Sequence, residues 1–188
     1  MKILLTTFLL ISIVGAFAQT PNLPIDSTTH LITYSGIVNV AGNKDELYSR
    51  AREWFAKTYK SAQNVIQMDT KDKIVGKALM QVYYKGGDYG YINYTISIYL
   101  KDGKYKYEIT DFYHKGEVRT GGVYVGNRYF ETPDIPDYGA CEEMMHEKKK
   151  HAQKVFNSLI TQMDENIKPL IASMNESMNK QIAKKDDF

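Results

Sequence analysis

Four histidines, one cysteine and several aspartates are the residues of this chain that could carry metal or nucleophilic chemistry. His146 and His151 are five positions apart, roughly 140° around a helix, so they cannot share a metal ion on one face. His114 follows Asp111 by three positions and has no third ligand nearby in the sequence. Cys141 has no histidine placed beside it to act as a base. The sequence therefore predicts no catalytic residue, no metal site and no cofactor, and it favours a surface position for each histidine.

Glycine pairs and isolated carboxylates are better explained as turns than as sites. Gly86-Gly87 and Gly121-Gly122 lack the strand-to-helix context of a phosphate loop. The aspartates at positions 69, 72, 134 and 137 lack the spacing of a calcium loop. The chain has 24 basic and 22 acidic residues, a formal net charge of +2, which gives no general attraction to nucleic acid. We therefore expect no nucleic-acid partner.

Residues 1–18 are typical of a secretory signal peptide. Lys2 is a positive start, an apolar run extends from Ile3 to Val14, and small residues precede a predicted cleavage between Ala18 and Gln19. The run is shorter than the about 20 residues that span a membrane, and no later segment reaches that length. We therefore expect a secreted or periplasmic protein with no transmembrane segment after cleavage; an uncleaved anchor is the alternative.

After the predicted signal peptide, the remaining residues are typical of a mixed α+β protein in three parts. Residues 19–29 form an extended leader that contains Pro21 and Pro24, residues 30–136 an α+β domain, and residues 137–188 a helical segment. The first strand is expected within residues 31–40.

A helix is predicted from Asn43 to about Tyr59. Asn43 and Glu46 have the spacing of a capping box. One face is apolar, and it consists of Leu47, Ala51, Trp54, Phe55 and Thr58, whereas Arg50 is among the residues expected toward solvent. The only tryptophan, Trp54, is expected to pack against a sheet.

Strands follow at residues 65–69, 74–84, 91–101 and 104–113, with a hairpin turn at Asp102-Gly103. Alternation places Ile92, Tyr94, Ile96, Ile98 and Leu100 on one face and polar side chains on the other. In the strand at 104–113, Tyr105, Tyr107, Ile109 and Tyr113 are expected to share a face. A small hairpin is predicted from 123–125 and 128–130. From Tyr138 onward the pattern is helical and amphipathic, with a kink or break expected near Lys168 because Pro169 removes a helical hydrogen bond.

Four segments of this sequence together resemble a known family. They are Leu23-Pro24-Ile25-Asp26, the helix opening at 42–55, Ile74-Val75-Gly76-Lys77-Ala78, and the hairpin at 94–107. The ordered set resembles a domain of unknown function with a TBP-like fold (domain-of-unknown-function family 4468), which occurs in secreted proteins of Gram-negative bacteria. The resemblance covers roughly residues 24–113. It implies a strand, a helix and a curved antiparallel sheet closed by a later helix, and it implies no activity. The DNA-binding role of the TATA-box-binding protein does not follow from the fold.

The function hypothesis rests on the polar face of this predicted sheet. The chain has 15 tyrosines against one tryptophan and seven phenylalanines, and tyrosine suits half-buried binding surfaces. We predict a non-enzymatic binding module whose partner is an unknown protein, peptide or glycan of the cell envelope. Its candidate contact residues are Tyr83, Tyr91, Asn93, Tyr99, Lys101 and Lys106. Alternatively, the segment from Gly116 to Pro136 covers this face.

Two other functions are kept open. The long C-terminal amphipathic helix could drive homo-oligomerisation or dock on an envelope assembly, which would make the protein structural. A hydrolase of cell-envelope material is the third hypothesis, although the sequence offers no acid–base pair for it.

Overall fold

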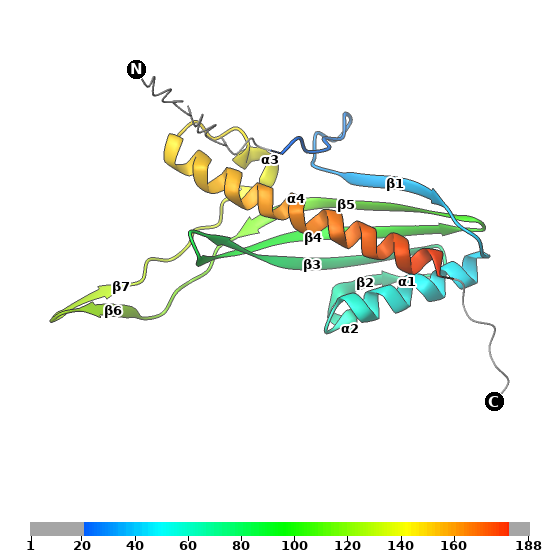
Figure 1. Ribbon diagram of the computed structural model, residues 1–188, viewed down its shortest axis with the longest axis horizontal. Helices are drawn as coiled ribbons and strands as arrows, with labels where there is room; N and C mark the ends of the chain where they lie inside the picture. The colour runs from blue at the N-terminus through cyan, green and yellow to red at the C-terminus, as the bar shows by residue number, and fades with distance from the viewer. Residues whose placement is uncertain (1–20, 181–188) are drawn as a thin grey trace, which may run out of the picture.

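Within residues 21–180, which the structure describes, a six-stranded antiparallel sheet carries two helices on one face (Figure 1). This is a computed structural model. The predicted signal peptide and its cleavage site at Ala18 and Gln19 lie outside the described residues. Among the described residues, no helix is long and apolar enough to cross a membrane.

The main strands and the two long helices follow the order that the sequence predicts. The strands are β1 (Tyr34–Asn39), β2 (Ile66–Asp69), β3 (Lys73–Tyr84), β4 (Gly87–Lys101), β5 (Lys104–Lys115), β6 (Gly122–Val125), β7 (Arg128–Glu131) and β8 (Gly139–Ala140). The helices are α1 (Lys44–Thr58), α2 (Ala62–Val65), α3 (Cys141–Met144) and α4 (Lys150–Asn179). The main sheet has the order β1-β5-β4-β3-β2, with β8 paired to β5, while β6 and β7 form a separate hairpin. The predicted strand, helix and meander are confirmed.

The core lies between one face of the sheet and the two long helices. The predicted alternation along β4 is confirmed, because Ile92, Ile96 and Ile98 are fully buried. They join the buried faces of α1 and α4 in one hydrophobic cluster. Burying one face only is the arrangement expected of an antiparallel meander.

Helix α1 begins as the sequence predicts, with Asn43 as the N-cap of a complete capping box. The Asn43 side chain accepts from the Glu46 N–H at 2.9 Å, and the Glu46 carboxylate accepts from the Asn43 N–H at 3.1 Å. The first turn is also tied to the β4–β5 hairpin, because the Lys44 N–H donates to Asp102 at 2.7 Å. These contacts satisfy backbone donors that a helix start leaves free.

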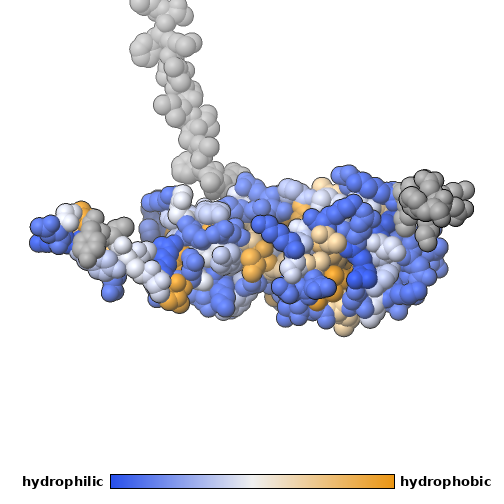
Figure 2. Space-filling model, turned by 90° about the horizontal axis from the view of Figure 1, so that it is seen from below, coloured by the Kyte–Doolittle hydropathy of each residue, from blue (hydrophilic) through white to orange (hydrophobic). Residues whose placement is uncertain are grey.

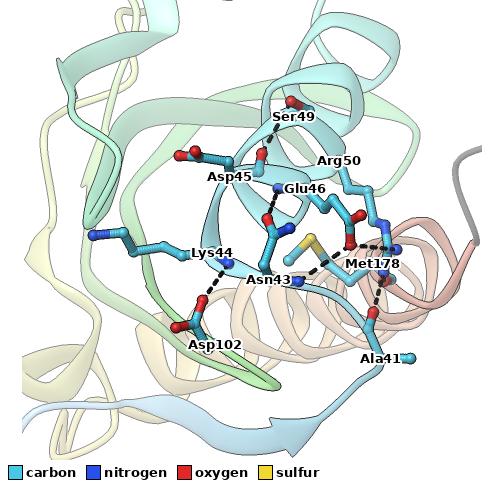
Figure 3. A network of polar contacts seen from close by, with 9 residues as sticks. All are labelled: Ala41, Asn43, Lys44, Asp45, Glu46, Ser49, Arg50, Asp102 and Met178. Atoms are coloured by element: carbon cyan, nitrogen blue, oxygen red, sulfur yellow. Dashed lines mark hydrogen bonds and ion pairs between the residues drawn. The ribbon is translucent and has the colours of Figure 1, made fainter.

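The expected solvent position of Arg50 is wrong, since this residue is only 5% exposed. Its Nη1 donates to the carbonyl oxygen of Ala41 at 2.7 Å and to that of Met178 at 2.9 Å (Figure 3). Met178 belongs to the last turn of α4, whose carbonyls have no partner within the helix. A cation is favourable there because it opposes the negative end of the helix dipole. Arg50 therefore joins the start of α1 to the end of α4.

Trp54 contacts α4 in addition to packing in the core. Its indole N–H donates to the Ser173 hydroxyl at 3.1 Å, and its ring lies edge-on to Phe55 and Tyr59. The tryptophan therefore links two helices, which the apolar pattern of α1 alone did not indicate. Thr58, which was expected on the buried face, is exposed.

Strand β5 contains a β-bulge that reverses its alternation. Asn93 of β4 faces Tyr113, whereas Thr95 faces Thr110, so β5 has one extra residue between these pairs. Asp111 lies there in the left-handed region at φ 58°. A slip of one residue moves every later side chain to the opposite face. Phe112 is therefore buried and Tyr113 is 45% exposed, which corrects the prediction that Tyr113 shares the buried face of Tyr105.

The same bulge places His114 in the interior, where it is fully buried; the expected surface position is wrong for this histidine. Its Nε2 lies 2.8 Å from the Tyr89 carbonyl oxygen, and its Nδ1 lies 3.4 Å from the Tyr138 N–H. The neutral ring thus donates through Nε2 and accepts through Nδ1. Burial lowers the pKa of His114, because the charged form would lose its hydration.

The C-terminal segment differs from its prediction in two ways. It does not form one helix from Tyr138, because α3 ends at Met144 and α4 begins at Lys150. Helix α4 then runs unbroken for 30 residues through Pro169, so, of the kink or break expected near Lys168, the break is wrong. The carbonyl that Pro169 leaves without its helical donor is that of Glu165, and both residues are exposed, so water can reach it.

Replacing Arg50 by alanine tests the link between the two helices. We expect Arg50→Ala to lower the free energy of unfolding by about 2–4 kcal/mol, because the buried Met178 carbonyl and the partly buried Ala41 carbonyl lose a charged donor. Chemical denaturation measures this loss. The control is Arg52→Ala, because Arg52 is exposed and pairs with Asp69 on the surface; it should cost less than about 1 kcal/mol. An equal loss of unfolding free energy in the two variants would contradict the proposed link between α1 and α4 through Arg50.

The burial of His114 makes stability depend on pH. Since its folded pKa is lowered, stability is complete above the unfolded pKa of about 6.5 and declines as the pH falls below it. We expect the melting temperature to fall less between pH 8 and pH 5 in His114→Gln than in the unchanged protein. His146→Gln, which alters an exposed histidine, is the control and should match the unchanged protein. Parallel pH curves for all three proteins would refute the effect.

Candidate functional site

Among residues 21–180, no helix or strand covers the face of the sheet opposite α1 and α4. The alternative that residues 116–136 cover this face is not what the structure shows, because β6 and β7 project away from the end of the sheet (Figure 1). The base of this arm is held by a backbone pair between Glu117 and Ile135 and by the Arg119 N–H, which donates to Asp134 at 2.7 Å. Most polar side chains that β3, β4 and β5 direct toward this face are therefore at least partly exposed, whereas Ser97 is buried.

Tyr99 is the centre of the most organised polar cluster on this face. Its neighbours in the strand register are Lys73 on β3 and Lys106 on β5. The Lys73 ammonium lies 4.6 Å from the centre of the Tyr99 ring, and that of Lys106 lies 5.5 Å from it. Both distances are in the range of cation–π attraction. The Tyr99 hydroxyl donates to Glu108 at 2.8 Å, which fixes the ring.

A carboxylate balances part of the positive charge in this cluster. Lys106 and Glu108 form an ion pair at 2.6 Å. The hydrogen bond from Lys106 lowers the pKa of Glu108, and the same bond raises the pKa of Lys106. Both groups are thus charged at neutral pH. With Lys73 added, two ammonium groups and one carboxylate surround the Tyr99 ring, which suits a polar ligand.

A shallow hollow of about 590 Å³ lies beside Tyr99, and Lys73 and Lys101 are among the residues that line it. A larger hollow, of about 900 Å³, lies nearer the other end of the sheet. It extends along the outer edge of β3 at Lys77 and Leu79, and Asn93 lines it. On the helix side it reaches Tyr59 and Tyr94, whose hydroxyls are 3.2 Å apart. Burial raises the pKa of both phenols, so they act only as neutral hydrogen-bonding groups.

The six predicted contact residues do not form one pocket. Tyr99, Lys101 and Lys106 lie together, and Asn93 lines the larger hollow. Tyr91 is eight residues from Tyr99 along β4, which is about 27 Å in an extended strand. Tyr83 lies beyond Tyr91 near the β3–β4 turn, where its backbone binds the Gln162 side chain. A small ligand could therefore contact one group or the other.

Sequence reasoning missed Lys73 and Glu108 in the Tyr99 cluster. Glu108 is two residues from Lys106 and on the same face of β5, so strand alternation could have indicated it. Lys73 could not be assigned, because a second irregularity between Gln81 and Tyr83 shifts the pairing of β3 with β4 by one residue.

The geometry offers little for bond-breaking chemistry. Within residues 21–180, no group of three or more His, Cys, Asp or Glu side chains lies close enough to hold a metal ion. Cys141 is fully buried, and burial raises the pKa of its thiol to about 12. A thiol in this state is a poor nucleophile because the thiolate is scarce. The sheet face that carries the Tyr99 cluster is the candidate site.

Comparison with known proteins assigns the fold but no activity. Residues 34–115 match the family model described as Domain of unknown function (DUF4468) with TBP-like fold. A TBP-like protein from Parabacteroides distasonis is 13% identical, with a TM-score of 0.52 over 80% of this chain and 97% of that one. A DUF4468 family protein from Bacteroides ovatus is 14% identical, with a TM-score of 0.48 over 80% and 90%. No curated protein matches this chain.

The burial of Cys141 predicts an unreactive thiol. We expect a thiol reagent such as Ellman's reagent to leave the folded protein unmodified at pH 8, because the thiol is inaccessible and its pKa is raised. The same reagent should react fully after guanidinium chloride is added, which serves as the internal control. The released chromophore measures both. Rapid modification of the folded protein would contradict the buried position.

Proposed function

We propose that this protein, whose residues 34–115 form a domain of unknown function with a TBP-like fold, is a non-enzymatic binding module. It acts outside the cytoplasm, in the periplasm or after secretion, as the leader at residues 1–18 suggests. Its partner is a protein, peptide or glycan of the cell envelope. The single observation that carries this proposal is the uncovered sheet face with Tyr99 held between two lysines.

The chemistry of this cluster supports recognition of polar partners. An aromatic ring offers a flat apolar surface, and the surrounding ammonium and carboxylate groups offer directed hydrogen bonds. The ring is positioned before any ligand arrives, because Glu108 and the two lysines hold it. Less side-chain freedom is then lost on binding, which favours affinity.

The alternative hypothesis, self-association through the C-terminal helix, was based on an apolar stripe along α4. The apolar positions of α4 that suggested this role are buried within the protein itself, and they include Leu159, Met163, Ile167, Met174 and Met178. That stripe is already used to close the core. The hydrolase hypothesis still has no acid–base pair to test.

Crosslinking in the native host, followed by mass spectrometry, would identify the partner and the face that contacts it. Against that partner, we expect Tyr91→Ala combined with Tyr99→Ala to weaken binding about tenfold or more, because buried tyrosines often dominate interface energy. The two single variants should weaken binding to different extents, because Tyr91 and Tyr99 are far apart on β4. Tyr129→Ala makes the same change on the projecting arm and should have no effect. An unchanged set of crosslinks and affinities in the double variant would refute the proposed face.

A further inference from the structure

Strand β3 has a stretch of outer edge that no described segment pairs with. Strand β2 pairs with β3 only as far as Gly76. At the start of β3, the backbone N–H and carbonyl of Lys73 exchange hydrogen bonds with Thr70 at 3.2 and 3.0 Å. At its end, the backbone N–H and carbonyl of Tyr83 bind the Gln162 side chain at 3.0 and 2.7 Å. Both residues therefore turn their backbone polar groups outward.

The register between these ends identifies the free groups. Outward-facing groups recur at every second residue of a strand, and β3 pairs one-to-one with β4 from Lys73 to Gln81. Lys77, Leu79 and Gln81 therefore point their N–H and carbonyl groups away from the sheet, and among residues 21–180 no backbone partner meets them. The free stretch from 77 to 82 is about 20 Å long. Such edges are usually protected in natural proteins.

The Gln162 amide shows what this edge binds. Its carbonyl oxygen accepts from the Tyr83 N–H, and its NH₂ donates to the Tyr83 carbonyl. A residue of an added antiparallel strand would make the same two bonds. Gln162 thus ends the free stretch on one side as β2 ends it on the other.

The surroundings of the edge favour an apolar segment with an acidic residue. Leu79 is 58% exposed at the middle of the stretch, and the hollow of about 900 Å³ continues from it to Val65 at the end of α2. Figure 2 views the molecule from below Figure 1 and shows apolar surface among hydrophilic surroundings. Lys60 and Lys77 also line this hollow, and neither takes part in any of the ion pairs formed among the described residues. Asp111 is the acidic residue of the lining.

We propose that the edge of β3 at residues 77–82 binds an extended peptide segment of a partner as an additional strand. Backbone hydrogen bonds to Lys77, Leu79 and Gln81 hold the segment, as in other cases of strand addition. An apolar side chain of the segment packs beside Leu79, and an acidic one lies near Lys77 and Lys60. This site is distinct from the Tyr99 cluster, so either proposal can fail without the other.

The register disfavours a second copy of this chain as the occupant. A two-fold pairing centred on Leu79 would place Val82 of one copy opposite Gly76 of the other. That position is already taken, because Ile66 of β2 pairs with Gly76. A folded copy would therefore collide with β2, whereas a short peptide can leave the edge after about five residues.

Selection of a displayed random heptapeptide library on the purified protein provides the probe, and the enriched peptide is then synthesised. N-methylation at alternate residues should reduce its affinity at least tenfold, while methylation at the residues between should have little effect, because only every second amide faces β3. Leu79→Pro should reduce the affinity similarly. Of the backbone hydrogen-bonding groups it removes only the outward N–H of residue 79, a change that edge strands tolerate. Leu79→Val keeps that N–H and is the matched control.

Two further measurements separate this proposal from others. The melting temperature of Leu79→Pro shows whether the variant is folded, and the methylated peptides test the site without any change in the protein. The Tyr91→Ala and Tyr99→Ala variants should bind the peptide normally. The proposal is overturned if no peptide is enriched, if methylation shows no alternation, or if Leu79→Pro binds like the unchanged protein. Light scattering that shows a dimer, lost in Leu79→Pro, would assign the edge to a second copy instead.

Discussion

The docking of α4 on one face of the sheet is the interaction on which the rest of the structure depends. The helix lies entirely outside residues 34–115, which match the family model, yet it supplies much of the apolar surface that closes the core. Polar bonds fix its position along its length: Asp164 accepts from the Tyr34 hydroxyl at 2.8 Å, and Asn175 accepts from that of Tyr105 at 2.5 Å. Such bonds require a particular geometry. They therefore select one placement of α4 on the sheet, whereas apolar packing alone would allow several placements.

The sequence predicted the elements better than it predicted their faces. Alternation in β4 and the capping box at Asn43 are local patterns, and each appears in the structure where it was expected. The face of Tyr113 and the burial of His114 depend instead on one extra residue at Asp111. A bulge leaves no reliable trace in hydrophobic periodicity, because it inverts the pattern without interrupting it. The same reason explains why the alignment of Lys73 with Tyr99 was not foreseen.

Contacts across long sequence separations were the second limit on prediction. Arg50 was assigned to the charged, solvent-facing side of its helix, but it binds the Met178 carbonyl, which lies 128 positions away in the sequence. Gln162 likewise reads as an ordinary polar helix position, and only the fold brings it to Tyr83. The candidate binding residues were chosen by face, which the structure supports for β4. Their division into separate groups follows from strand length, which a list of residue types does not contain.

The long helix also determines how much of the sheet edge is open. Gln162 can bind Tyr83 only because α4 is held in place by its other contacts, and this bond ends the free stretch of β3. At the other end, β2 and α2 follow directly from α1, which α4 holds through Arg50 and Trp54. Both limits of the edge are therefore set by the same packing that buries the opposite face. A change that shifts α4 would alter the length of the exposed backbone as well as the stability of the core, so a binding defect caused by an α4 variant is local only if its melting temperature is unchanged.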